Sequence, residues 1–314
     1  MMKLLLKALL IVLVIISFTM ACHSQEELWE ELSNKRYRLY QMRRHEESAK
    51  VGEEALKVAE KTFGPNHPKT ALSMNELAIV YQYQGKYAEA EALFEKALTI
   101  REQAFGENRL EVATSLNNLA DNYRIQGRYT EAEPLQKRAL KIYEKNLESD
   151  HSYVAISLNN LAMVYRGQGR YAEAEPLYKR AISIYEKAFG KDHIIVATVL
   201  DNLAELYRLQ NKYAEAEPLF NQALKIFEKA HGEDHPRVAT SLNNLARLSQ
   251  GQGKYAEAEV LFKRALTTRE QALGPEHPFV ATVCENMADL YSQIGKKDEA
   301  EKLQARARKI RSKR

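Results

Sequence analysis

The strongest pattern along this chain is a block of 42 residues that repeats without insertion. Within one block, apolar side chains recur three and four residues apart, as at Leu116, Leu119, Ala120 and Tyr123, which is one stripe of a helix. Aligning the chain on itself places the repeat starts at Glu31, Ser73, Ser115, Ser157, Val199, Ser241 and Val283. Positions within a repeat are counted below from this start, which is position 0.

Each repeat predicts a second helix after the first, with its own stripe through residues such as Ala174, Tyr178 and Ala181. A helix-breaking residue separates the two stripes, namely Gly85, Gly127, Gly169, Gly253 and Gly295, with Arg43 and Asn211 in the other two repeats. Pro134, Pro176 and Pro218 fall close to the first turn of the second helix, where a missing N–H costs least. The pattern predicts roughly thirteen or fourteen helices and no strand.

A single helical hairpin cannot bury both of its stripes, so neighbouring repeats are expected to stack into an all-α solenoid with a continuous core. The repeats resemble tetratricopeptide repeats at their leucine, alanine and aromatic positions, as in Leu161, Ala162, Tyr165, Ala174, Tyr178 and Ala181. Their length and the stretches LNNLA, YAEAEPL and G-x-x-H-P are most similar to the repeats of kinesin light chains and their bacterial relatives. The resemblance covers residues 31–314 and implies a right-handed superhelix of about seven 42-residue units.

The repeats differ in regularity. Gly52 lies inside the second helix of the first repeat, and Gln304 and Arg308 stand in the last repeat where interior repeats have an aromatic and an aliphatic residue. A polar outer face suits a terminal repeat. We therefore expect a divergent N-terminal repeat at 31–72, five regular repeats at 73–282 and a truncated C-terminal capping repeat at 283–314.

The first 22 residues have the plan of an export signal. Lys3 and Lys7 precede an apolar run from Ala8 to Cys22, which would reach about 22 Å as a helix, short of the roughly 30 Å hydrocarbon core of a bilayer. The closing letters TMAC resemble a bacterial lipobox. This resemblance implies a signal peptide at 1–21, lipidation of Cys22 and a short linker at 22–30.

Two alternatives to the lipid anchor stay open, namely ordinary signal cleavage near Ala21 and an uncleaved anchor. His23 stands where an aspartate often marks retention in the inner membrane, so outer-membrane sorting is favoured if the cell has two membranes. We expect a protein of a bacterial cell envelope, lipid-anchored and facing the periplasm, with a secreted or periplasmic soluble protein as the alternative.

A row of asparagines marks the side of the first helix that faces away from its apolar stripe. These residues occupy position 3 of five repeats, as Asn118, Asn160, Asn202, Asn244 and Asn286. In tetratricopeptide proteins this side resembles the lining of a concave groove, in which carboxamides hold the backbone of a bound peptide. The alternative is that the asparagines bond neighbouring helices and serve the stack, since Asn is a poor helix former that needs some compensation.

Residues that vary on the same face are where partner choice would be encoded. Position 6 holds Asp121, Met163, Glu205 and Arg247. Position 9 holds a row of Arg124, Arg166 and Arg208, and a lysine or arginine follows at position 13 in six repeats. These cations would favour acidic side chains on a ligand, as the resemblance to kinesin light chains also implies. The arginine row at position 9 could equally pair with Glu89, Glu131 or Glu173 of the following helix.

Composition narrows the function classes. The formal net charge of +4 is too small for a general nucleic-acid binder, and two cysteines give no disulfide framework. The basic residues from Arg306 onward are expected mainly to solvate a helix face. Cys284 lies on the apolar stripe and is expected to be a small buried hydrophobe.

Five histidines recur 42 residues apart in the turn before a helix, as His67, His151, His193, His235 and His277. Stacked repeats would separate them by about 20 Å, too far for one metal ion, so capping of the turn is favoured. No P-loop, HExxH, CxxC or nucleophile with a nearby base is present, and we expect no cofactor, no metal, no small-molecule substrate and no enzymatic activity.

The sequence therefore predicts a membrane-tethered scaffold that binds an extended segment of another protein in its groove, and the family resemblance favours an acidic or aromatic segment. A structural tether or assembly factor that uses edges and loops instead of the groove is the alternative.

Overall fold

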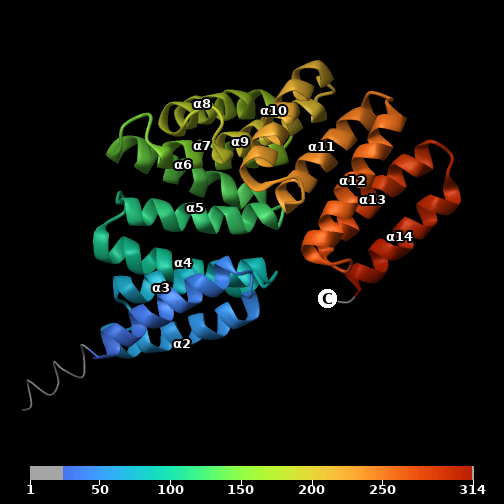
Figure 1. Ribbon diagram of the computed structural model, residues 1–314. Helices are drawn as coiled ribbons and strands as arrows, with labels where there is room; N and C mark the ends of the chain where they lie inside the picture. The colour runs from blue at the N-terminus through green and yellow to red at the C-terminus, as the bar shows by residue number, and fades with distance from the viewer. Residues whose placement is uncertain (1–23, 313–314) are drawn as a thin grey trace, which may run out of the picture. The chain divides into compact units, whose positions relative to one another are not determined.

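A computed structural model describes residues 24–312 of this chain. In this range the chain forms helices joined by short turns and contains no strand. The helices gather into two compact units, with the boundary in the chain between Leu147 and Glu148, and the units are described separately (Figure 1). The predicted all-α architecture of stacked helical hairpins is confirmed within each unit.

Unit 1 begins with a helix over residues 24–41, which pairs with α2. Each later first helix packs on the second helix before it and on the one after it, so that the hairpins stack in chain order. The helices of this unit are α2 (His45–Phe63), α3 (Pro68–Tyr83), α4 (Tyr87–Phe105), α5 (Leu110–Ile125) and α6 (Tyr129–Asn146).

Unit 2 repeats the same plan with four hairpins (Figure 1). Its helices are α7 (Ser152–Gly167), α8 (Tyr171–Phe189), α9 (Ile194–Leu209), α10 (Tyr213–His231), α11 (Pro236–Gly251), α12 (Tyr255–Leu273), α13 (Pro278–Gln293) and α14 (Lys297–Arg311). The first helices are α7, α9, α11 and α13, and the second helices are α8, α10, α12 and α14.

The turns follow from residue types that the repeat places at fixed positions. The residue that ends each hairpin turn has a left-handed backbone, with φ of 75° to 80° at the glycines and 58° and 57° at Arg43 and Asn211. The five turn histidines are N-caps, and each Nδ1 accepts the backbone N–H two residues later at 3.1 to 3.3 Å. The prediction that these histidines cap the turn is therefore confirmed.

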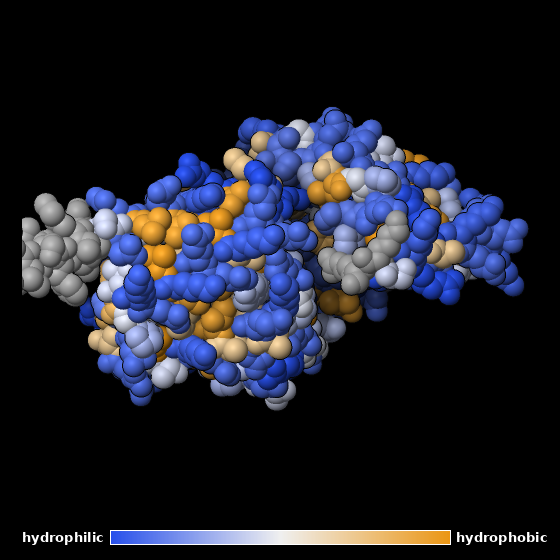
Figure 2. Space-filling model, turned by 90° about the horizontal axis from the view of Figure 1, so that it is seen from below, coloured by the Kyte–Doolittle hydropathy of each residue, from blue (hydrophilic) through white to orange (hydrophobic). Residues whose placement is uncertain are grey.

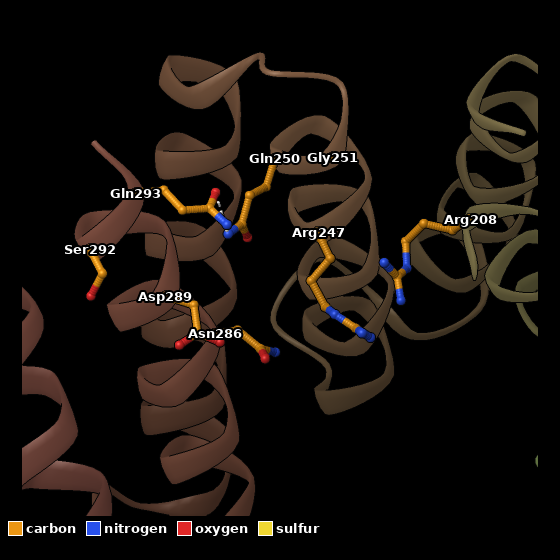
Figure 3. A pocket seen from close by; sticks show the side chains of 8 residues that line it. All are labelled: Arg208, Arg247, Gln250, Gly251, Asn286, Asp289, Ser292 and Gln293. Carbon is orange, nitrogen blue, oxygen red and sulfur yellow. Dashed lines mark hydrogen bonds between the residues drawn. The ribbon is translucent and has the colours of Figure 1, made fainter. Parts of the chain in front are cut away.

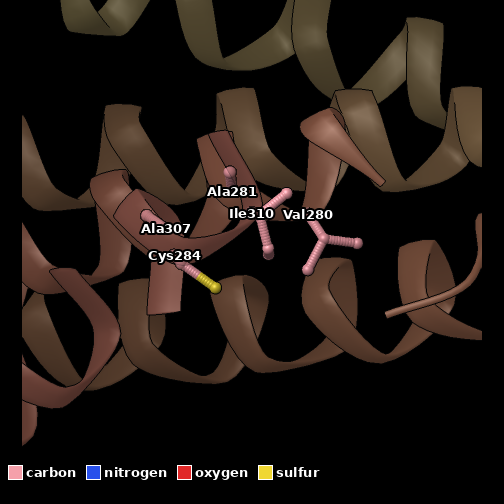
Figure 4. Close-up of a cluster of buried hydrophobic side chains, with 5 residues drawn as sticks. All are labelled: Val280, Ala281, Cys284, Ala307 and Ile310. Carbon is pink, nitrogen blue, oxygen red and sulfur yellow. The ribbon is translucent and has the colours of Figure 1, made fainter. Parts of the chain in front are cut away.

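The core of each unit runs between its first and second helices. Position 21, on the second helix, holds an aromatic residue with no exposed surface in four repeats, namely Phe94, Tyr178, Phe220 and Phe262. Cys284 of α13 is fully buried with Val280 and Ala281 against Ala307 and Ile310 of α14 (Figure 4), as expected of a small hydrophobe. Gln304 and Arg308 of the last repeat are exposed, which gives α14 the predicted polar outer face.

One local expectation needs correction, and it concerns the N-terminal linker. Residues 24–30, which the sequence suggested as part of a linker, are helical because Trp29 packs with Ala55 and Ala59 and donates from Nε1 to Ser73 Oγ at 2.7 Å. The prolines at 134, 176 and 218 lie inside α6, α8 and α10, just beyond the first turn. The predicted signal peptide and Cys22 lie outside the described residues.

Candidate functional site

Four of the five asparagines at position 3 donate a hydrogen bond to the preceding first helix. In unit 1, Asn118 Nδ2 donates to Asn75 Oδ1 at 3.0 Å. In unit 2 the same bond joins Asn202 to Asn159 at 3.1 Å, Asn244 to Asp201 at 2.8 Å and Asn286 to Asn243 at 2.9 Å. We call this set the amide ladder, and the side of the first helices that carries it the groove face.

The hydrogen bonds of the amide ladder compensate for the low helix propensity of asparagine. Each bond joins position 3 of one repeat to position 2 of the repeat before it, so it fixes the spacing of neighbouring first helices. An asparagine amide has two N–H donors and a carbonyl, and the ladder uses one donor. The structural role left open by the sequence is therefore present, and the remaining amide groups are still able to contact a peptide. The predicted contact with a peptide stays a prediction.

The arginine row at position 9 pairs mainly with its own helix. Arg124 bonds Asp121 at 2.6 and 2.8 Å, and Arg208 makes a two-pronged contact with Glu205 at 2.6 and 2.9 Å. Arg166 instead reaches the backbone and side-chain oxygens of Asn202 at 3.4 and 3.5 Å. None of these three pairs with the glutamates of the following helix that the sequence suggested.

Glu205 is the charged centre of the groove face in unit 2. Besides Arg208 it binds Arg247 of the next first helix, with a distance of 3.2 Å between Nη1 and Oε1. Burial by itself would raise the pKa of the Glu205 carboxyl, but the hydrogen bonds from Arg208 and the positive charges of Arg208, Arg247 and Arg166 outweigh it and lower that pKa. The Glu205 carboxylate therefore stays ionised, and through Arg247 it links α9 to α11.

A polar pocket of 520 Å³ opens beside this centre in unit 2. Figure 3 shows Arg208 and Arg247 on one side and Asn286 and Asp289 on the other, while Gln250 donates to Gln293 at 3.1 Å. The lining residues come from α9, α11 and α13 and are Arg208, Arg247, Gln250, Gly251, Asn286, Asp289, Ser292 and Gln293. Donors and acceptors therefore meet in one hollow of the groove face.

Sequence reasoning missed Gln250 and Ser292 as site residues. Both occupy position 9, where three earlier repeats carry an arginine. The shorter side chains, together with Gly251 at position 10, leave the space that an arginine would fill. The change from arginine to a small polar residue at one repeated position is the signal that could have identified this pocket.

The groove face of unit 1 has a different character. Leu72, Tyr83 and Ile125 lie on it with 37%, 59% and 42% of their surface exposed. Tyr83 also packs edge-on against Tyr40 and stacks on His45, with ring centroids 5.2 and 5.5 Å apart. The Asp121 and Arg124 pair is the main charged feature that the sequence placed here.

Two of the basic residues at position 13 pair with carboxylates and aromatic rings of their own unit. Arg128 lies over the ring of Tyr123 at 4.2 Å and bonds Glu91 and Glu131 at 2.7 and 2.9 Å. Arg170 repeats the pattern with Tyr165 and Glu173. These arginines therefore stabilise the hairpin turn. Because their charges are already paired, they are poor partners for an acidic ligand.

Within residues 24–312, no group of three or more His, Cys, Asp or Glu side chains could hold a metal ion. None of the helices described here is long and apolar enough to cross a bilayer.

The stacked antiparallel helix pairs define an α-solenoid of helical hairpins. A family model described as tetratricopeptide repeat matches residues 39–103, 74–145, 153–229, 212–271 and 237–313. The chain belongs to the tetratricopeptide repeat family. A search of curated proteins found no significant match.

Solved structures agree with this assignment. BtubC (BKLC) from P. vanneervenii is 26% identical over 73% of this chain and 91% of its own, with a TM-score of 0.56. A putative kinesin light chain from Podosopora anserina with nearly identical TPR-like repeats is 28% identical over 65% of this chain and 97% of its own, with a TM-score of 0.53. The apo form of RapI shares the fold at 16% identity and a TM-score of 0.69, covering 91% of this chain and 98% of RapI.

Proposed function

We propose that this chain is a non-enzymatic interaction scaffold that binds an extended segment of a partner protein on its groove face. The polar pocket beside Glu205 carries this proposal. Its convergent amide, guanidinium and carboxylate groups suit the backbone and polar side chains of a peptide. The pocket volume of 520 Å³ lies in the range of about 300 to 1,000 Å³ that is usual for binding sites.

The groove face of unit 1 supports the same role with other chemistry. Exposed apolar and aromatic side chains such as Leu72, Tyr83 and Ile125 can anchor hydrophobic residues of a partner. An apolar or aromatic segment would therefore suit the groove face of unit 1, and a polar or charged segment that of unit 2. The resemblance to kinesin light chains agrees with this proposal, because it implies ligands in which aromatic and acidic residues occur together.

The scaffold is proposed to be tethered to a membrane through lipid on Cys22. The support is the leader plan and the lipobox-like TMAC stretch, which precede the first helix by a few residues. Two or three acyl chains anchor a protein stably where one does not. Cys22→Ala is expected to abolish labelling by a radioactive or clickable fatty acid, and a labelled variant would remove the anchor from the proposal. Location at the outer membrane, facing the periplasm, is part of the same proposal.

A crosslinked pull-down from membrane extract tests the groove proposal. The full chain is compared with Arg247→Ala/Gln250→Ala/Gln293→Ala, after circular dichroism shows equal helicity. A variant of exposed lysines on the second helices of the same unit, Lys225→Ala/Lys229→Ala/Lys263→Ala, is the matched control. We expect one partner to be captured by wild type and control and lost by the groove variant. Equal capture by all three proteins would contradict binding at this pocket.

A further inference from the structure

In unit 1 an arginine links the second helices α4 and α6. No arginine stands at the equivalent position between α2 and α4. Arg138 of α6 reaches back to Glu102 of α4 at 2.6 Å and to the carbonyl oxygen of Glu107 at 3.3 Å. One guanidinium thus links α6 to α4 and to the turn that follows α4. A planar fork of N–H donors can bond a carboxylate and a carbonyl at once, which an ammonium group does less well.

The same contact recurs in unit 2. Arg264 of α12 binds Glu228 of α10 at 2.9 Å and Glu233 at 3.1 Å. Arg306 of α14 binds Glu270 at 2.5 Å and the carbonyl oxygen of Pro275 at 3.3 Å. All three arginines occupy position 23 of their repeat, so this contact is a regular part of the architecture.

Between α2 and α4 the acceptors are present and the arginine is not. Position 23 is Lys96 in this repeat, and the acceptors equivalent to Glu102 and Glu107 O are Glu60 and the carbonyl of Pro65. Within residues 24–312, neither Lys96 nor Glu60 makes a side-chain ion pair. Position 19 is Ala92, where α6, α8 and α10 have a proline and α12 has Val260. The helix pair α8 and α10 also lacks the arginine, because position 23 of that repeat is Gln222. Unlike α4, however, α10 has a proline at position 19, namely Pro218.

The consequence is an open cleft on the second helices of unit 1. Two adjoining hollows of 690 and 440 Å³ share Glu60 and Ala92. The first contains Pro65 and Lys96, and the second has an aliphatic floor of Leu56, Leu77 and Leu93. Figure 2 shows hydrophobic residues on the surface at the N-terminal end of unit 1.

The rim of the cleft is acidic. Glu53, Glu60, Glu89 and Glu95 outnumber Lys57 and Lys96 among the charged lining residues. An apolar floor beside a carboxylate and a carbonyl that elsewhere bind a guanidinium is complementary to a side-chain pair, one aliphatic and one arginine.

We propose that the cleft between α2 and α4 is a second interaction site, which takes a segment of a partner protein that presents an arginine beside aliphatic side chains. The arginine occupies the place of the missing position-23 arginine, against Glu60 and the carbonyl of Pro65. The aliphatic side chains rest on Leu56, Leu77 and Leu93. The site lies on the second helices, away from the groove face, and does not rest on the function proposed above.

A single substitution in the chain tests the proposal. Lys96→Arg places an arginine at position 23, as in the repeats with Arg138, Arg264 and Arg306, and this side chain should occupy the cleft itself. A dodecamer display library is selected on the full chain in mild detergent, and the enriched peptides are measured by fluorescence anisotropy. We expect enriched peptides to share an arginine flanked by leucine-like residues. Replacing that arginine with the uncharged isostere citrulline should weaken binding about tenfold, in line with the loss of a charge-assisted hydrogen bond.

Three variants locate the binding. Lys96→Arg and Glu60→Gln should each weaken binding about tenfold, the first by occupying the cleft and the second by removing its charged acceptor. Lys141→Arg, at an exposed position of α6, is the matched control and should leave the affinity for these peptides unchanged. A library that enriches no peptide, peptides without a shared arginine, or equal affinity for wild type, Lys96→Arg and Glu60→Gln would each overturn the proposal.

Discussion

The groove faces of unit 1 and unit 2 share one framework and differ in chemistry. Both are ordered by the amide ladder, through Asn118 in unit 1 and Asn244 in unit 2. On this framework unit 1 exposes Tyr83 and Ile125, whereas unit 2 gathers charges around Glu205. The comparison shows that residues repeated at the same position hold the helices in place. The positions that differ between repeats set what each surface can bind.

The largest expected effect tests the shared framework. Phe94 in unit 1 and Phe220 in unit 2 occupy the same repeat position and are both fully buried. Phe94→Ala and Phe220→Ala should each lower the free energy of unfolding by about 3–5 kcal/mol, because each leaves a cavity of aromatic size. Urea unfolding followed by circular dichroism measures both. A loss below about 1 kcal/mol for one of them would show that the two units are not packed alike.

The next effect concerns a charge that stands in the ladder of unit 2 only. Asp201 takes the place that Asn75 and Asn243 hold in other repeats. Burial, and to a lesser degree the charge of Glu205, raises its pKa to about 7, although the hydrogen bond from Asn244 and the charges of Arg166 and Arg237 act in the opposite direction. Its Oδ1 is buried and lacks a hydrogen-bond partner, so Asp201 is a costly substitute for asparagine.

Asp201→Asn should therefore stabilise the chain at pH 8 by up to about 4 kcal/mol, because the pKa of Asp201 rises from 3.8 to about 7 and a difference of one in pKa is worth about 1.4 kcal/mol. Between about pH 4 and 7 the folded state keeps a proton that the unfolded state has released, so the stability that this group contributes falls as pH rises through that window. The variant should lose this slope and show no gain below pH 4. Asn243→Asp in the next repeat is the matched control and should introduce a slope of the same sign. Parallel pH profiles for wild type and Asp201→Asn would contradict this account.

The fold could be predicted in detail because its determinants are local. The 42-residue period, the turn glycines and the capping histidines each act within a few residues of one another. The helical start at residues 24–30 could not be predicted, since it depends on contacts of Trp29 with Ala55, Ala59 and Ser73, more than twenty residues away.

The candidate site was only partly predictable for the same reason. A helical wheel gives the direction of Asn244 but not its partner, which lies in the preceding repeat. The pairing of Arg124 with Asp121 and of Arg208 with Glu205 obeys the i, i−3 spacing within one helix and was readable from the sequence. The missing arginine at Lys96 was also visible in the repeat alignment, but its meaning required the contacts of Arg138.

The ladder itself is the next test of the shared framework. Asn118→Ala and Asn244→Ala each remove one hydrogen bond between first helices and should cost about 1 kcal/mol of stability. Asn244→Ala should cost slightly more, because it leaves the Asp201 carboxylate without its partner. Chemical unfolding at pH 7 checks both. If neither variant changes stability while partner capture is lost, the asparagines act on the peptide and not on the stack.

The smallest expected effect compares two hairpin turns. Arg43 in unit 1 and Asn211 in unit 2 both have a left-handed backbone, with φ of 58° and 57°. Arginine is strained there, so Arg43→Gly should gain about 0.5–1 kcal/mol. Asparagine tolerates this conformation, and Asn211 Oδ1 also accepts a hydrogen bond from Tyr213 at 2.8 Å, so Asn211→Gly should give no gain. Thermal unfolding of the two variants measures the difference. An equal gain for both would mean that backbone strain at the turn does not depend on which residue carries it.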